Sequence, residues 1–194
     1  MRGCRLLLVG LLGLGVAACG DDDATVTTAV TTTAAVMTTA LACTPPASTS
    51  DRTGAGFPNG LSPRVGADAR IGLHPCFERF VIEFGGTGPF PGWFVRYVPL
   101  PVRADPSDLP VDLPGAGAAI VVTIQAWMPD PFGNVGYSGP TTLPTAGFRT
   151  FRAVTQVGNF EGTASWALGV DRVRGFSTMV LSDPPRLVID VATG

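Results

Sequence analysis

Short runs of alternating apolar and polar residues recur along the second half of the chain, separated by glycine and proline. In residues 93–98, for example, Trp93, Val95 and Tyr97 share one side of an extended chain. This period of two indicates a half-buried strand, because successive side chains of a strand point to opposite faces. Composition and alternation together predict strands at residues 80–84, 93–98, 120–127, 151–157, 163–170, 176–181 and 186–191.

The spacing of glycine and proline excludes a long helix from the same region. After residue 65, the longest stretch without either residue is Ala118–Met128, and most of it is a predicted strand. Seven or more short strands in about 130 residues predict an all-β domain with a single β-sandwich. The longer loops are expected at residues 85–92 and 129–147.

The first 18 residues have the order of a signal peptide. Arg2 and Arg5 precede an apolar run, and Val16-Ala17-Ala18-Cys19 fits a lipobox, in which small residues precede a cysteine that receives lipid. An ordinary secretory signal is the alternative, and the run is too short for a membrane span of about 20 residues. The sequence therefore predicts a signal peptide at 1–18 and an extracytoplasmic chain anchored to the cell membrane through acylated Cys19.

Residues 19–65 are expected to form a linker. Asp21-Asp22-Asp23 is followed by a tract of threonine, alanine and valine to about Ala42, and residues 44–65 are rich in proline, serine, glycine and threonine. Such residues bury too little apolar area to offset the entropy of ordering, so a disordered stalk is predicted. The threonines suit O-glycosylation, although low complexity explains them equally well. The folded domain is placed at residues 66–194.

Two cysteines remain for the domain once Cys4 leaves with the signal peptide and Cys19 is acylated. Cys43 and Cys76 are a candidate disulfide, because exported proteins fold in an oxidising compartment. Two free thiols are the alternative. A bridge would fasten the end of the linker to the domain.

Charge and side-chain chemistry exclude several classes of function. The 13 basic residues are all arginine, and removal of Arg2 and Arg5 leaves 11 against 15 acidic residues, a formal charge of −4, so nucleic acid is not an expected partner. The single histidine, His74, has no neighbouring metal-ligand pattern, and no metal or cofactor is predicted. Glu78, Glu83 and Asp171 are interpreted as charged strand ends. No catalytic residues are predicted, and the protein is not expected to be an enzyme.

Large aromatic residues and arginines are the candidate ligand-binding groups. Aromatic rings stack on sugar faces, and guanidinium groups bind carboxylates through paired hydrogen bonds. The alternative is that the tryptophans lie in the core and the arginines are solvated strand edges. The candidates are Trp93, Arg96, Tyr97, Trp127, Arg152 and Trp166.

Ordered blocks of the sequence also resemble a known family. They are residues 70–74 (RIGLH), 77–84 (FERFVIEF), 91–98 (PGWFVRYV), 158–170 (GNFEGTASWALGV) and 185–191 (PRLVIDV). In this order they resemble the AMIN-like domain of actinobacterial lipoproteins, over about residues 66–192. Pro75 and Cys76 depart from the small polar turn that is usual in the family.

The resemblance implies a β-sandwich related to the AMIN domains of cell-wall amidases and pilus secretins. Those domains target proteins to peptidoglycan and are not themselves catalytic. The leading hypothesis is therefore a lipid-anchored envelope protein that binds peptidoglycan or another wall polymer. The alternative is a module that docks an envelope protein such as a wall hydrolase, for which an exposed sheet edge or an apolar patch around Phe132 and Tyr137 would argue.

Overall fold

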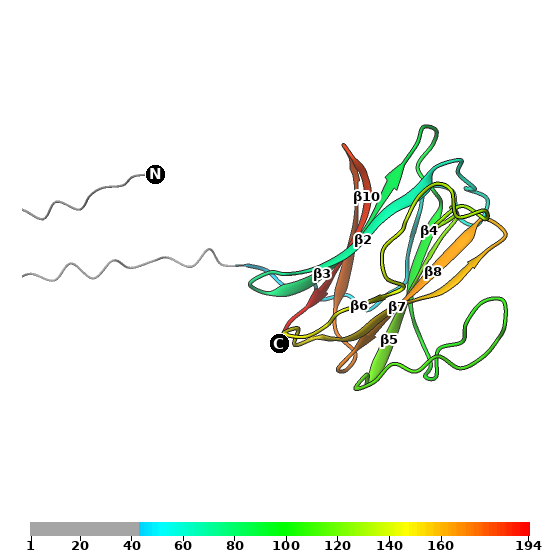
Figure 1. The fold of residues 1–194 in the computed structure, drawn as a ribbon. Helices are drawn as coiled ribbons and strands as arrows, with labels where there is room; N and C mark the ends of the chain where they lie inside the picture. Colours follow the sequence, from blue (N-terminus) through cyan, green and yellow to red (C-terminus); the bar gives the residue numbers. More distant parts are fainter. Residues whose placement is uncertain (1–42) are drawn as a thin grey trace, which may run out of the picture. The chain divides into compact units, whose positions relative to one another are not determined.

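The computed structural model describes residues 43–194, which fold into two antiparallel sheets packed as a sandwich (Figure 1). The predicted signal peptide, the predicted lipidation site Cys19 and the threonine-rich tract lie outside the described residues. The strands are β1 (Arg52–Gly54), β2 (Val65–Leu73), β3 (Phe77–Gly85), β4 (Trp93–Val98), β5 (Ala118–Ile124), β6 (Thr142–Leu143), β7 (Phe151–Phe160), β8 (Thr163–Val170), β9 (Phe176–Ser182) and β10 (Pro185–Ala192). Within residues 43–194 there is no helix that could span a membrane.

One sheet has six strands in the order β1-β4-β5-β8-β7-β6, and the other has four in the order β2-β3-β10-β9. Each predicted strand has a counterpart among these ten, so the all-β fold and the single sandwich are confirmed. β1, β2 and β6 were not predicted as strands. β1 and β6 have only three and two residues, too short to show an alternation.

The main core fills the space between the sheets, as the alternation requires. From the four-stranded sheet, Phe80, Ile82 and Phe84 of β3 point inward and are almost completely buried. From the six-stranded sheet, Ile120, Val122 and Ile124 of β5 and their neighbours on β8 face them. Trp166 of β8 meets Phe80 with ring centroids 5.5 Å apart, so contacts between large side chains join the two layers.

A second apolar cluster lies on the opposite, outer face of the six-stranded sheet. Residues 99–117, here called the strap, leave β4, cross this face as far as β7 and return to β5 (Figure 1). At its far point, Asp105 N donates to Val157 O of β7 over 2.8 Å. Val102 and Leu113 of the strap are buried against the sheet.

Small residues on the sheet allow the strap to lie this close. Ala119, Ala153 and Ala167 occupy outer positions of β5, β7 and β8 and are buried beneath it. At Gly169, an added Cβ would stand 3.0 Å from the Cβ of Ala116 and 3.3 Å from that of Leu113. A larger side chain at this position would therefore push the strap off the sheet.

Residues 43–64, which fall within the expected linker of residues 19–65, run along one side of the sandwich. Ser48 O accepts a hydrogen bond from Phe176 N at the start of β9, and β1 then pairs with β4. The segment thus passes from the edge of one sheet to the edge of the other. Its backbone hydrogen bonds and its disulfide give it order that its composition does not indicate.

The two ends of the sandwich differ, and each is named here for its contents. The disulfide end holds Cys43, the turn between β2 and β3, and the C-terminal end of β10. The loop end holds the loops of residues 55–64, 86–92, 125–141 and 161–162.

Candidate functional site

A groove of about 440 Å³ lies on the outer face of the six-stranded sheet, where the strap leaves β4. Its floor is formed by β4 and β5, which pair directly at Arg96 and Val121. Its wall is the first part of the strap. We call it the strap groove, and it is lined by Arg96, Tyr97, Val98, Pro99, Pro101, Val102, Arg103 and Val121.

Arg96 supplies a positive charge to this apolar groove. Its guanidinium lies over the ring of Phe94, 5.3 Å from the centroid, which holds the side chain against the sheet. Among residues 43–194, Arg96 makes no ion pair and no side-chain hydrogen bond, so its donors are available to a ligand.

Arg103 stands on the strap side of the groove and is already partly engaged. Its Nη1 donates to the carbonyl of Asp108 over 2.8 Å and lies 3.6 Å from the Asp108 carboxylate. Both side chains are largely exposed, so this pair is weak and can be exchanged for a ligand. The groove can therefore present two guanidinium groups beside an apolar wall.

Two of the candidate tryptophans lie inside the protein. Trp166 is fully buried in the main core, and its Nε1 donates to the sulfur of Met128 over 3.4 Å. Trp93 is also buried, and its ring packs against Gly54 of β1. Neither ring can stack on a ligand, so the core alternative applies to both.

Tyr97 lines the groove but serves mainly as a structural link. Its hydroxyl donates to the carbonyl of Arg174 over 2.7 Å and accepts from the Arg174 backbone N–H over 2.8 Å. Burial raises the pKa of Tyr97 above its ordinary value. The residue thus fastens β4 to the segment that precedes β9.

The structure separates the two remaining candidates from Arg96. Trp127 lies at the loop end, half-buried, with its carbonyl accepting from Gly66 N over 2.8 Å. Arg152 is exposed at an irregularity of the β7–β8 pairing, next to Gly115 of the strap. Of the six candidates, the structure brings only Arg96 and Tyr97 together in one hollow.

A second hollow, of about 340 Å³, opens at the disulfide end beside the buried carboxylate of Glu78. Backbone N–H groups of Arg149, Thr150 and Phe151 donate to that carboxylate over 2.6–3.0 Å. Glu78 belongs to the four-stranded sheet and its donors lead into β7 of the other sheet. The interaction is therefore a polar bond between the layers, and its oxygens are occupied.

The other two acidic residues of the sequence-based set lie elsewhere. Glu83 faces outward and pairs with Arg70 at 3.2 Å. Asp171 binds Arg174 through two hydrogen bonds of 2.7 and 2.8 Å, which lower the pKa of the carboxyl. His74 is exposed and stacks on Phe77 with centroids 4.4 Å apart. Residues 43–194 contain no cluster of three His, Cys, Asp or Glu residues that could hold a metal ion.

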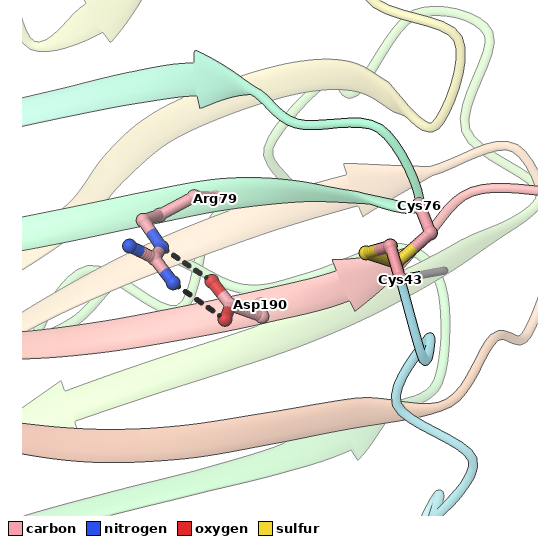
Figure 2. The surroundings of a disulfide bond; sticks show 4 residues. All are labelled: Cys43, Cys76, Arg79 and Asp190. Atoms are coloured by element: carbon pink, nitrogen blue, oxygen red, sulfur yellow. Dashed lines mark hydrogen bonds and ion pairs between the residues drawn. A yellow bond between two sulfur atoms is a disulfide. The ribbon is translucent and has the colours of Figure 1, made fainter. Parts of the chain in front are cut away.

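A disulfide joins Cys43 to Cys76, with the two Cα atoms 5.9 Å apart (Figure 2). It attaches the segment that leads into the domain to the turn before β3. On the same sheet, Arg79 of β3 binds Asp190 of β10 through two hydrogen bonds of 2.6 and 2.8 Å. The hydrogen bond to Asp190 raises the pKa of Arg79 above its ordinary value.

Apolar side chains are exposed at the loop end. Phe132 is 82% exposed, and Leu61 and Val135 are 63% and 61% exposed. Tyr137, which the sequence groups with Phe132, is instead buried, and its hydroxyl donates to the carbonyl of Pro140 over 2.7 Å. A shallow apolar hollow of about 300 Å³ adjoins Val135.

The comparisons with known proteins give one match. A family model described as an AMIN-like domain covers residues 64–193, which is well over half of the chain. No curated protein and no solved structure matches the sequence.

Proposed function

This chain belongs to the AMIN-like domain family, and from that premise we propose that it is a lipid-anchored envelope protein that binds peptidoglycan or another wall polymer in its strap groove. AMIN-like domains are envelope-associated modules and are typically non-catalytic. The observation that carries the proposal is Arg96, whose guanidinium has no ion-pair or hydrogen-bond partner among residues 43–194 and lies in an apolar groove.

The chemistry of wall polymers suits such a groove. Peptidoglycan carries carboxylates on its peptide stems and presents the apolar faces of its sugar rings. Arg96 and Arg103 supply donors for a carboxylate, and Val98 and Pro101 supply an apolar contact surface. The chain as a whole has a formal charge of −2, so attraction to an acidic polymer depends on these local positive charges.

Binding is tested with residues 41–194, a compact unit that contains both apolar clusters and both cysteines of the disulfide. We expect this unit to sediment with insoluble peptidoglycan. Arg96→Ala should weaken binding by about tenfold, because a charged hydrogen bond contributes about 1.5 kcal/mol or more. Arg149→Ala is the matched control, since Arg149 is also exposed and its side chain makes no ion pair among the described residues.

Two outcomes would contradict the proposal. If the unsubstituted unit stays in the supernatant, the domain does not bind the wall polymer and the proposal is wrong. Equal weakening by both substitutions would show that charge alone matters and that the strap groove is not the site.

The lipid anchor is tested separately in cells with the full chain. Cys19→Ala should release the protein from the membrane fraction, because Cys19 would be the acylated residue. Cys4→Ala is the matched control, as Cys4 would leave with the signal peptide. Retention of the Cys19→Ala protein in membranes would overturn the anchoring.

Docking of an envelope protein is the second candidate function, and the exposed apolar side chains of the loop end favour it. Monomeric proteins keep large exposed apolar patches few, and such patches commonly mark interfaces. A partner cross-linked to the unsubstituted protein should be lost on Phe132→Ser. The candidate fails if the same proteins are captured by both forms.

A further inference from the structure

The four outer strands of the two sheets differ in how well their edges are protected. β1 and β6, the outer strands of the six-stranded sheet, have three and two residues. Very short edge strands offer little backbone for pairing with another chain. The outer strands of the six-stranded sheet therefore present little backbone for strand addition.

β2, one outer strand of the four-stranded sheet, is protected by three features. Its pairing with β3 is irregular between Gly66 and Asp68, and it carries the charged residues Asp68 and Arg70. The loop that contains Pro140 and Pro144 lies beside it. Bulges, charges and covering loops are the usual means by which proteins block an edge.

β9, the other outer strand of this sheet, has none of these protections beyond its first residue, Phe176, which residues 46–48 cover. Its seven residues, Phe-Ser-Thr-Met-Val-Leu-Ser, include no charge and no proline, and its pairing with β10 is regular. Met179 is 38% and Val180 is 45% exposed. β9 is the last strand of its sheet and pairs only with β10.

The hydrogen-bond register shows which backbone groups of β9 point away from the sheet. Ala192 N donates to Gly175 O, so Ser177, Met179 and Leu181 also bond toward β10, since bonded pairs alternate along an antiparallel ladder. Thr178, Val180 and Ser182 therefore direct their N–H and C=O groups outward. These groups have no backbone partner among residues 43–194.

We propose that a second copy of this chain pairs with this edge, β9 against β9, in an antiparallel dimer whose two-fold axis passes between the two Val180 residues. The axis places Thr178 opposite Ser182 of the partner subunit, so the outward backbone groups of both chains meet in register. The two four-stranded sheets then form one continuous sheet across the interface.

Self-complementarity of the strand supports a second copy as the occupant. In this register Met179 lies opposite Leu181 of the partner subunit on the outer face, and the two Val180 side chains meet on the other. Every cross-strand pair is thus apolar with apolar or hydroxyl with hydroxyl. No like charges oppose one another, because the strand carries none.

The position of residues 46–48 limits the registers that are available. Phe176 N already donates a hydrogen bond to Ser48 O, so it is not available to a partner strand. Residues 46–47 lie so close to Gly175 that an added Cβ there would collide with them. A partner strand cannot extend past the beginning of β9. A dimer centred on Val180 pairs residues 178–182 and avoids this region.

The test uses residues 41–194 in sedimentation velocity over a range of concentrations up to millimolar. We expect a monomer–dimer equilibrium. Val180→Lys and Val180→Glu should each weaken the dimer by tenfold or more, because each puts like charges opposite one another at the axis. An equimolar mixture of the two variants should recover the dimer, since opposite charges then meet.

Val173→Lys is the matched control, because Val173 is also an exposed valine, 60% exposed, and lies outside β9. This variant should dimerise like the unsubstituted protein. A monomer at all concentrations would overturn the proposal. A dimer that persists in both Val180 variants would also overturn it. The same holds if the Val180→Lys and Val180→Glu variants do not associate when they are mixed. Wall binding at the strap groove does not depend on these outcomes.

Discussion

The disulfide end of the sandwich keeps charged side chains inside, whereas the loop end keeps apolar side chains outside. At the disulfide end, Glu78 is buried with its carboxylate fully bonded. Asp171 and Arg174 form a nearly buried pair there, because the segment before β9 bonds to Ala192 at the end of β10. At the loop end, Phe132 and Leu61 are exposed on loops that carry no strand.

This difference in side-chain burial indicates that the disulfide end stabilises the fold, whereas the loop end is available for binding. Buried polar groups cost free energy unless they are bonded, so they hold the chain in one arrangement and no other. Glu78 thus fixes how the two sheets meet where the chain enters the domain. Exposed apolar side chains add little to folding and remain available for contact with other molecules.

Replacement of Glu78 by alanine should have the largest effect on stability. It leaves the buried N–H groups of Thr150 and Phe151 without acceptors, and each unpaired group costs about 1–3 kcal/mol. We expect the free energy of unfolding to fall by about 3–5 kcal/mol in urea denaturation. Phe132→Ser, the loop-end counterpart, should change it by less than about 0.5 kcal/mol. Equal effects of the two substitutions would refute the difference between the ends.

Loss of the disulfide should have the next largest effect. Cys43 and Cys76 are 33 residues apart, and closing a loop of this size contributes roughly 3–4 kcal/mol. The double substitution Cys43→Ser with Cys76→Ser, measured in urea, should lose up to that amount. It should also speed proteolytic cleavage within residues 43–50, while cleavage in the loop of residues 129–136 keeps its rate. Unchanged cleavage near Ser48 would show that the backbone bond to Phe176 is enough to hold the segment.

Alternation of apolar residues predicted the strands because it follows directly from burial of one face. It did not reveal the strap, whose apolar residues Val102 and Leu113 are scattered among proline and aspartate without a period. A signal was nevertheless present in the sheet. Ala153 and Ala167 stand at outward positions of predicted strands, where a solvated face would carry polar side chains.

The candidate binding residues were only partly predictable for a related reason. By residue type, Trp93, Trp166 and Arg96 were equally good candidates for ligand binding. They differ in the face of the strand from which each side chain projects, and this face follows from the alternation along the strand. Trp166 shares its face with Leu168 and Val170, whereas Arg96 takes the opposite face from Val95. The same alternation places Glu78 on the inner face of β3 with Phe80. The interpretation of Glu78 as a charged strand end did not take this into account. Arg103 could not be assigned, because its place depends on the path of the strap.

The pair of Asp171 and Arg174 should give the disulfide end a dependence on pH. Its hydrogen bonds to Arg174 lower the pKa of Asp171 in the folded protein, so the unfolded chain binds the proton more readily. The stabilisation is therefore present above the ordinary aspartate pKa of about 3.9 and is lost as the pH falls through the lower, folded value. Asp171→Asn should cost about 1–2 kcal/mol at pH 7 and progressively less below pH 4.

The matched control for this prediction is Asp108→Asn. Asp108 also pairs with an arginine, Arg103, but at 3.6 Å and with an 82% exposed side chain, so the pair contributes little. Urea denaturation at a series of pH values should show a large, pH-dependent loss of stability for Asp171→Asn and only a small loss for Asp108→Asn. If the loss of unfolding free energy caused by Asp171→Asn stays constant down to pH 3, the side chain stabilises the fold through its shape and not through its charge. The disulfide end would then owe its order to Glu78 and the disulfide alone.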